Sequence, residues 1–298
     1  MRTRIISGLA AVATLTACAP GPAPTPPAPP PTPAPAATGP SYVAMGDSAA
    51  AAPLVPSQGT PTGCLKSTNN YPSVLARRIG AVSFTDVTCS GARTEDLLSR
   101  SQPTHSGPVP PQLDAVRADT RLVTITVGGN DVDLSAKAAS CLRRSPGGEP
   151  CSAGFVADGV DTVSEAIEAG AAEWADLIGA VRAKAPDARI VLVGYGSYIR
   201  PQGCFPDEPI NPVDATYFAA KLDELDSRQQ QLASDAGVDY FDPRPLSAGR
   251  DLCADPAERY FEGFRPVNPA APLHPNGKGA NAFGTALADY VTSGRPGS

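Results

Sequence analysis

The sequence has 298 residues, with 24 lysine and arginine and 30 aspartate and glutamate side chains, and a formal net charge of −6 at pH 7. This acidic balance argues against nucleic acid as a partner, because nucleic-acid-binding proteins concentrate basic side chains on one surface. The chain has only two histidines and no Cys-x-x-Cys motif. We therefore expect neither a metal ion nor another cofactor.

The N-terminal region has the layout of an export signal. Residues 1–4 are basic, residues 5–15 are apolar, and small residues precede Cys18. The apolar run is shorter than the roughly 20 residues that span a bilayer. Because Leu-Thr-Ala-Cys at 15–18 resembles a bacterial lipobox, we interpret residues 1–17 as a lipoprotein signal peptide and Cys18 as the acylated residue. An ordinary secretory signal is the alternative, in which case the protein is secreted.

Residues 18–40 are expected to be the acylated cysteine followed by a linker. Half of the positions from 19 to 40 are proline, a composition that favours an extended tether or a disordered segment. Two of the 24 basic side chains precede Cys18, so processing would leave a net charge near −8. Attachment to the outer face of the membrane would then depend on the lipid rather than on charge.

Residues 41–298 alternate short apolar runs with longer helical patterns, which is typical of a parallel sheet with crossover helices. The expected strands are 41–45, 82–88, 122–127, 189–193 and 238–241, and the expected helices are 71–79, 156–185, 213–236 and 276–292. No proline-rich break or repeat divides this segment. We therefore expect one α/β domain, a three-layer α/β/α sandwich with a central, mostly parallel sheet. Since no heptad repeat demands a dimer, we expect a monomer.

Short polar motifs follow several of these strands. Gly-Asp-Ser at 46–48, Cys-Ser-Gly at 89–91, Gly-Gly-Asn-Asp at 128–131 and Gly-Tyr-Gly at 194–196 each come at a strand end. Each motif alone also fits an ordinary turn. Because ligands bind beyond the carboxyl ends of parallel strands, we expect these motifs to converge on one edge of the sheet.

The two histidines restrict the choice of catalytic base. A serine hydroxyl needs a neighbouring base, usually histidine, to act as a nucleophile. His105 lies in a polar, proline-containing loop, which favours an exposed surface position, whereas His274 directly precedes the last expected helix. If the chain is a serine hydrolase, Ser48 is therefore paired with His274.

Four motifs together resemble the SGNH hydrolases, also known as GDSL-type esterases and lipases. They are Gly-Asp-Ser at 46–48, Cys-Ser-Gly at 89–91, Gly-Gly-Asn-Asp at 128–131 and Leu-His-Pro-Asn at 273–276. The resemblance covers nearly all of residues 41–298 and implies the flavodoxin-like SGNH version of the sandwich. The motif at 45–49 is not the Gly-x-Ser-x-Gly of α/β-hydrolases.

The resemblance also implies the roles of individual residues. Ser48 would attack the ester carbonyl and His274 would take its proton. The backbone N–H groups of Ser48 and Gly91 and the side-chain amide of Asn130 would form the oxyanion hole.

One position departs from the family pattern. The family usually places an aspartate three residues before the histidine, and this sequence has Ala271 there. By resemblance to some secreted actinobacterial relatives, we predict that the backbone carbonyl of Ala271 orients His274, which leaves a Ser–His dyad. The alternative is a carboxylate from elsewhere, Asp251 or Asp255. Asp47 is expected to cap the turn before Ser48 rather than to act as the acid.

Six cysteines remain when Cys18 is set aside, and an even number in an exported chain predicts disulfides. Many connectivities are possible. Pairing of sequence neighbours would join Cys64 to Cys89, Cys141 to Cys151 and Cys204 to Cys253. Secreted actinobacterial lipases and phospholipases of the SGNH family carry three disulfides of this kind, which supports that choice.

The favoured function is an extracytoplasmic carboxylester hydrolase acting on acyl esters, with lipid or phospholipid as candidate substrates. A polysaccharide O-acetyl esterase and a non-catalytic ligand-binding lipoprotein are the alternatives. We expect the segments 49–70, 132–155 and 197–212 to line the substrate pocket.

Overall fold

Five parallel strands form the central sheet in a computed structural model that describes residues 37–145 and 147–293. Across the sheet the order is β2 (Ala81–Asp86), β1 (Gly39–Gly46), β3 (Leu122–Thr126), β6 (Arg189–Val193) and β7 (Asp239–Phe241). Every residue of β3 is buried, as expected for a parallel strand covered on both faces. All five expected strands are present, with small shifts at their ends.

The expected signal peptide, Cys18 and the linker as far as residue 36 lie outside the described residues. From residue 37 onward the chain forms one compact unit. Within the described part of the chain, no helix is both long and apolar enough to cross a bilayer.

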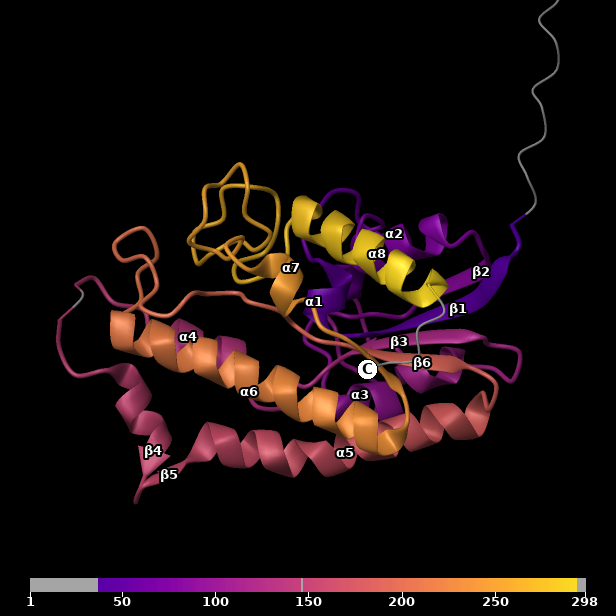
Figure 1. Ribbon diagram of the computed structural model, residues 1–298, viewed down its shortest axis with the longest axis horizontal. Coiled ribbons are helices and arrows are strands. Elements are labelled where there is room, and N and C mark those ends of the chain that lie inside the picture. The colour runs from indigo at the N-terminus through magenta and orange to yellow at the C-terminus, as the bar shows by residue number, and fades with distance from the viewer. Residues whose placement is uncertain (1–36, 146, 294–298) are drawn as a thin grey trace, which may run out of the picture. The chain divides into compact units, whose positions relative to one another are not determined.

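Helices cover both faces of the sheet, so the predicted three-layer α/β/α sandwich is confirmed (Figure 1). The helices are α1 (Ser48–Ala51), α2 (Tyr71–Arg78), α3 (Thr94–Leu98), α4 (Leu134–Ser140), α5 (Thr162–Lys184), α6 (Pro212–Ala236), α7 (Arg244–Ser247) and α8 (Gly277–Thr292). Short 3-10 segments occupy Thr62–Cys64, Gln112–Ala115 and Cys151–Phe155. Helices α2 and α8 pack together on one face, and α5 packs with α6 and α3 on the other.

The expected helix at 156–185 begins later than predicted. Residues 156–161 form a small hairpin of β4 (Val156–Ala157) and β5 (Val160–Asp161). Its turn residues Asp158 and Gly159 have φ values of +53° and +81°, and Asp-Gly is a favoured pair for such tight turns. Asp161 then caps α5 by accepting hydrogen bonds from the N–H groups of Val163 and Ser164.

All three expected disulfides are present and join cysteines that neighbour each other in sequence. They are Cys64–Cys89, Cys141–Cys151 and Cys204–Cys253. The first joins the end of the Thr62–Cys64 segment to the loop that follows β2.

The strand order creates a crevice at the carboxyl edge of the sheet. The chain passes from β1 to β2 on one side and then returns to place β3 on the other side of β1. Such a reversal of strand order is where ligands bind in open parallel sheets. Ser48 follows β1 and Asn130 follows β3, so both lie at this crevice.

Candidate active site

The turn that carries Ser48 follows β1 directly and has little freedom. Gly46 has a φ of +153°, and a Cβ there would lie 2.7 Å from a backbone oxygen of β3, so glycine is required. The buried Gln112 side chain donates to the Gly46 carbonyl at 2.9 Å and accepts from the Gly46 N–H at 2.7 Å. Asp47 caps α1 by accepting from the Ala49 N–H at 2.8 Å. The predicted capping role of Asp47 is confirmed, and Ser48 is the first residue of α1.

The turn after β3 places Asn130 at the same edge. The Asn130 side-chain amide donates to the Ala92 carbonyl at 3.0 Å, which leaves its second N–H for another acceptor. The next carboxylate, Asp131, accepts from the N–H of Thr94 at 2.9 Å and from the Trp174 indole at 3.0 Å. These bonds tie the turn to α3 and α5, so the Asn130 amide has a defined orientation.

Gly91 lies in the loop after β2, in a left-handed conformation with a φ of +82°. It is exposed, and it is not among the residues that line the pocket described below. The preceding backbone is held by the Cys64–Cys89 disulfide and by a hydrogen bond from the Ser90 N–H to the Cys64 carbonyl. The role of Gly91 in the oxyanion hole stays a prediction.

The loop before α8 holds His274 through the main chain, at a different residue from the one expected. The Nδ1 atom of His274 lies 2.6 Å from the carbonyl oxygen of Pro272, so the assignment to Ala271 is wrong. Leu273 has a φ of +59°, a left-handed conformation that turns the chain between this carbonyl and the ring. Ala271 instead donates its N–H to the Pro53 carbonyl at 2.9 Å.

The alternative carboxylates have other partners. Asp251 accepts from the Arg200 guanidinium at 3.0 Å, and Asp255 accepts from the Ala257 N–H at 2.7 Å. Across residues 37–145 and 147–293, His274 makes no hydrogen bond or ion pair with a carboxylate. His105 is exposed and is not among the residues that line the pocket.

A buried carboxylate supports the His274 loop, and the sequence did not reveal it. Glu262 accepts from the guanidinium of Arg259 at 3.2 Å and from the Asn276 amide at 2.8 Å, and its backbone N–H donates to the His274 carbonyl at 2.9 Å. Burial raises the pKa of Glu262, but hydrogen bonds from Arg259, Asn276 and Asn268 outweigh burial and lower it to about 2. The carboxylate is therefore ionised at neutral pH.

Ser48, Asn130 and His274 line one pocket, which encloses about 720 Å³ of empty space including its open mouth. Most of the remaining wall is apolar and comprises Ala49, Leu134, Ala138, Tyr198, Ile199, Ile210, Phe218, Leu222, Leu252, Phe264 and Leu273. The three expected loop segments all contribute to this wall. The residues from α6 and those at 252 and 264 were not expected, because no local motif marks them.

The ionisable groups of the pocket are shifted by burial. Burial lowers the pKa of His274 below its ordinary value, while the hydrogen bond to Pro272 acts in the opposite direction. Burial raises the pKa of Asp47 to about 7, against the lowering effect of hydrogen bonds from Tyr195 and Ala49.

Over the described ranges, no group of three or more His, Cys, Asp or Glu side chains is arranged to hold a metal ion.

Comparison with known proteins agrees with this geometry. The GDSL-like lipase/acylhydrolase family matches residues 44–282. Lipase 2 of Streptomyces coelicolor is 34% identical over 260 residues, which are 84% of this chain and 85% of that protein. A lipase of Streptomyces rimosus is 28% identical over 214 residues, 72% of this chain and 73% of that protein.

Among solved structures, phospholipase A1 from Streptomyces albidoflavus superimposes with a TM-score of 0.70 at 25% identity, over 85% of this chain and 99% of the other. The extracellular lipase from Streptomyces rimosus gives the same TM-score and coverage at 24% identity and supports the fold. The match to the family over residues 44–282 and the identity to Lipase 2 show that this chain is a carboxylic ester hydrolase of the GDSL-like lipase/acylhydrolase family.

Proposed function

We propose that this protein hydrolyses acyl esters outside the cytoplasm through a dyad of Ser48 and His274. The observation that carries the proposal is the bond between His274 Nδ1 and the Pro272 carbonyl in a pocket that Ser48 also lines. A carbonyl oxygen can only accept, so Nδ1 carries the ring proton. The other ring nitrogen, Nε2, is then unprotonated and serves as the base.

The reaction follows from these atoms. Ser48 Oγ attacks the ester carbonyl carbon while Nε2 of His274 takes the hydroxyl proton, and the carbonyl oxygen becomes negatively charged. As the first residue of α1, Ser48 has an N–H that no helical carbonyl accepts, and it donates to this oxygen together with Gly91 N–H and the Asn130 amide. The tetrahedral species collapses as His274 returns the proton to the alcohol. Water then cleaves the acyl-serine by the same steps.

The pocket wall favours an acyl chain over an acetyl group on a polysaccharide. Leu134, Ile199, Ile210 and Phe218 offer apolar surface, and each buried CH₂ contributes roughly 0.8 kcal/mol. Sugar rings need polar groups along an open cleft, which this wall does not provide. Relatives described as lipases and as a phospholipase A1 support acyl esters as the substrate class.

The experiment is hydrolysis of p-nitrophenyl esters from acetate to dodecanoate by the purified protein. Ser48→Ala and His274→Ala should each lower kcat by about 10⁴-fold or more. His105→Ala is the matched control and should keep wild-type kcat, because His105 is exposed and does not line the pocket. Undiminished activity in Ser48→Ala would refute the mechanism, and no activity in the wild type would favour a ligand-binding lipoprotein.

Export and lipid anchoring are part of the proposal. They are supported by the signal layout at 1–17, by Cys18 and by three disulfides, which form in oxidising compartments. In a bacterial host, the native protein should fractionate with the membrane and carry a mass increment on Cys18. Cys18→Ala should release it, and a soluble, unmodified wild type would show that Cys18 is not acylated.

A further inference from the structure

The Tyr195 hydroxyl connects two turns that end different strands. It accepts a hydrogen bond from the Gly129 N–H at 2.7 Å and donates one to Asp47 Oδ2 at 2.6 Å. The other oxygen of Asp47 accepts from Ala49 and so caps α1. One buried hydroxyl therefore joins the turns at the carboxyl ends of β1 and β3. Its residue, Tyr195, lies just after the end of β6.

The two connected residues directly precede two of the proposed oxyanion donors. Asp47 comes before Ser48, and Gly129 comes before Asn130. A Cβ on Gly129 would lie 3.1 Å from the Tyr195 hydroxyl oxygen, so a side chain there would push this hydroxyl away by a few tenths of an ångström. Lengthening either hydrogen bond would change the distance between the Ser48 N–H and the Asn130 amide.

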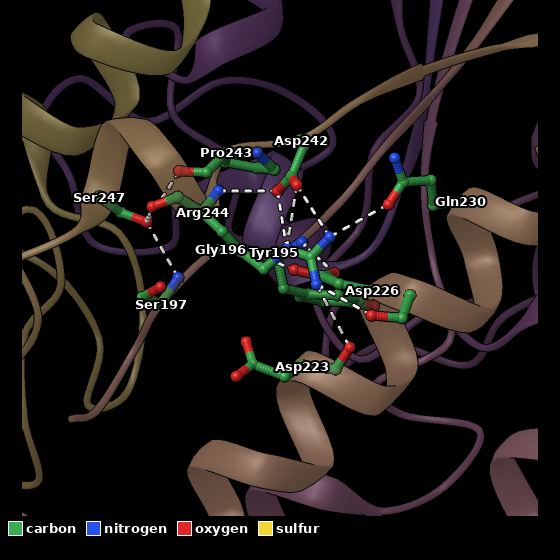
Figure 2. A network of polar contacts seen from close by, with 11 residues as sticks. Tyr195, Gly196, Ser197, Asp223, Asp226, Gln230, Asp242, Pro243, Arg244 and Ser247 are labelled. Carbon is green, nitrogen blue, oxygen red and sulfur yellow. Dashed lines mark hydrogen bonds and ion pairs between the residues drawn. The ribbon is translucent and has the colours of Figure 1, made fainter. Parts of the chain in front are cut away.

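The backbone of Tyr195 is held from α6. The buried carboxylate of Asp226 accepts from the Tyr195 N–H at 2.8 Å and from the Gly196 N–H at 2.9 Å. Figure 2 shows Asp226 against the backbone of these two residues, close to Arg244, which pairs with Asp242 at 2.8 Å. The ring of Tyr195 is therefore fixed at its backbone end as well as at its hydroxyl.

We propose that Tyr195 is a positioning residue for ester hydrolysis, whose hydroxyl sets the spacing between the Ser48 turn and the Asn130 turn. This inference rests on the proposed function. Misplacement of catalytic groups by about 1 Å can cost about 10²-fold in rate, and removal of one oxyanion donor costs about 10²–10³-fold. Loss of the Tyr195 hydroxyl, which only loosens the spacing of the donors, should therefore lower the rate less than removal of an oxyanion donor itself.

The test compares Tyr195→Phe with Tyr42→Phe. The Tyr42 hydroxyl is also buried and bonds to Thr124 at 2.7 Å in the sheet, so both variants lose one buried hydroxyl. With p-nitrophenyl butyrate, Tyr195→Phe should lower kcat by about 10- to 100-fold and change KM by less than about twofold. Tyr42→Phe should keep kcat within about twofold, although it too loses thermal stability with its buried hydrogen bond.

Three results would overturn the proposal. They are wild-type kcat in Tyr195→Phe, an equal fall in kcat in both tyrosine variants, and a change confined to KM. If Tyr195→Phe does not fold, Asp47→Asn removes the charged acceptor and keeps an oxygen for the Ala49 N–H. It should lower kcat by a similar factor, and unchanged kcat would refute the connection. Failure of the proposed function is distinguishable, because it would appear as hydrolysis that survives Ser48→Ala.

Discussion

The backbone N–H of Glu262 donates a 2.9 Å hydrogen bond to the carbonyl oxygen of His274. The Glu262 side chain is fully buried and pairs with the buried guanidinium of Arg259. The same carboxylate accepts from Asn276, whose side chain caps α8. The position of the proposed base therefore depends on an ion pair outside the pocket.

Glu262→Gln should destabilise the protein by about 3–5 kcal/mol at pH 7, because it leaves the buried Arg259 without its counter-charge. Glu258→Gln is the matched control, since Glu258 pairs with Arg250 at the surface, where an ion pair contributes less than about 1 kcal/mol. Urea unfolding measures both. An equal, small loss in the two variants would mean that the buried pair does not support this loop.

The stability lost in Glu262→Gln should depend on pH. Because the pKa of Glu262 is lowered from 4.5 to about 2, its ionised form stabilises the fold fully above 4.5. That stabilisation is lost as the pH falls toward 2. The difference in free energy of unfolding between wild type and Glu262→Gln should therefore shrink over this range. A difference that stays constant between pH 5 and pH 2.5 would contradict the lowered pKa.

As the pH is lowered, kcat/KM should fall with the protonation of Asp47, at a higher pH than the protonation of His274. The ionised carboxylate of Asp47 accepts the hydrogen bond from the Tyr195 hydroxyl. Burial raises the pKa of this carboxyl group to about 7, and the ionisable side chains that also act on it are Tyr195 and Asp131. As the pH falls, Asp47 is protonated first. His274 stays a base below 6.5, because burial lowers its pKa.

Asp47→Asn should therefore move the acid limb from near 7 to below 6.5, where His274 itself is protonated. The measurement is a pH profile of kcat/KM for both proteins with one ester. If the limb stays in place in Asp47→Asn, ionisation of Asp47 does not limit the reaction.

Filling the apolar wall should shorten the preferred acyl chain. Ala138 lines the pocket from α4 and its neighbour Ala139 is exposed. Ala138→Phe should lower kcat/KM for p-nitrophenyl octanoate by about tenfold or more and leave the acetate ester nearly unchanged. That factor corresponds to burial of about two CH₂ groups. Ala139→Phe is the control, and equal chain-length profiles for the two variants would place the acyl chain elsewhere.

Two disulfides should differ in their effect on catalysis. Cys64→Ala/Cys89→Ala releases the loop before Gly91, whereas Cys141→Ala/Cys151→Ala opens the loop after α4, which contains none of the proposed oxyanion donors. The sequence separations of 25 and 10 residues predict losses of about 3.5 and about 2.7 kcal/mol. Only the first variant should also lower kcat at a temperature where both are folded. Equal kcat values would argue against Gly91 as an oxyanion donor.

Much of the fold could be predicted because its signals are local. The buried run 122–127, the proline and glycine positions and the alternation of strands and helices depend on residues close together in the sequence. The helix expected from residue 156 begins instead at Thr162. The Asp-Gly pair at 158–159 is a local turn signal that already argued against a helix at these residues.

The sequence by itself led to the predicted pairing of Ser48 with His274, because the chain has only one other histidine and that one lies in a polar loop. Only the tertiary structure decided which group orients the proposed base, His274. The left-handed conformation of Leu273, which brings Pro272 rather than Ala271 to the ring, occurs in a loop packed on Glu262. The Tyr195 hydroxyl likewise forms hydrogen bonds with Gly129 and Asp47, which are 66 and 148 positions away in the sequence. Such contacts depend on how distant strands assemble, and no local pattern encodes them.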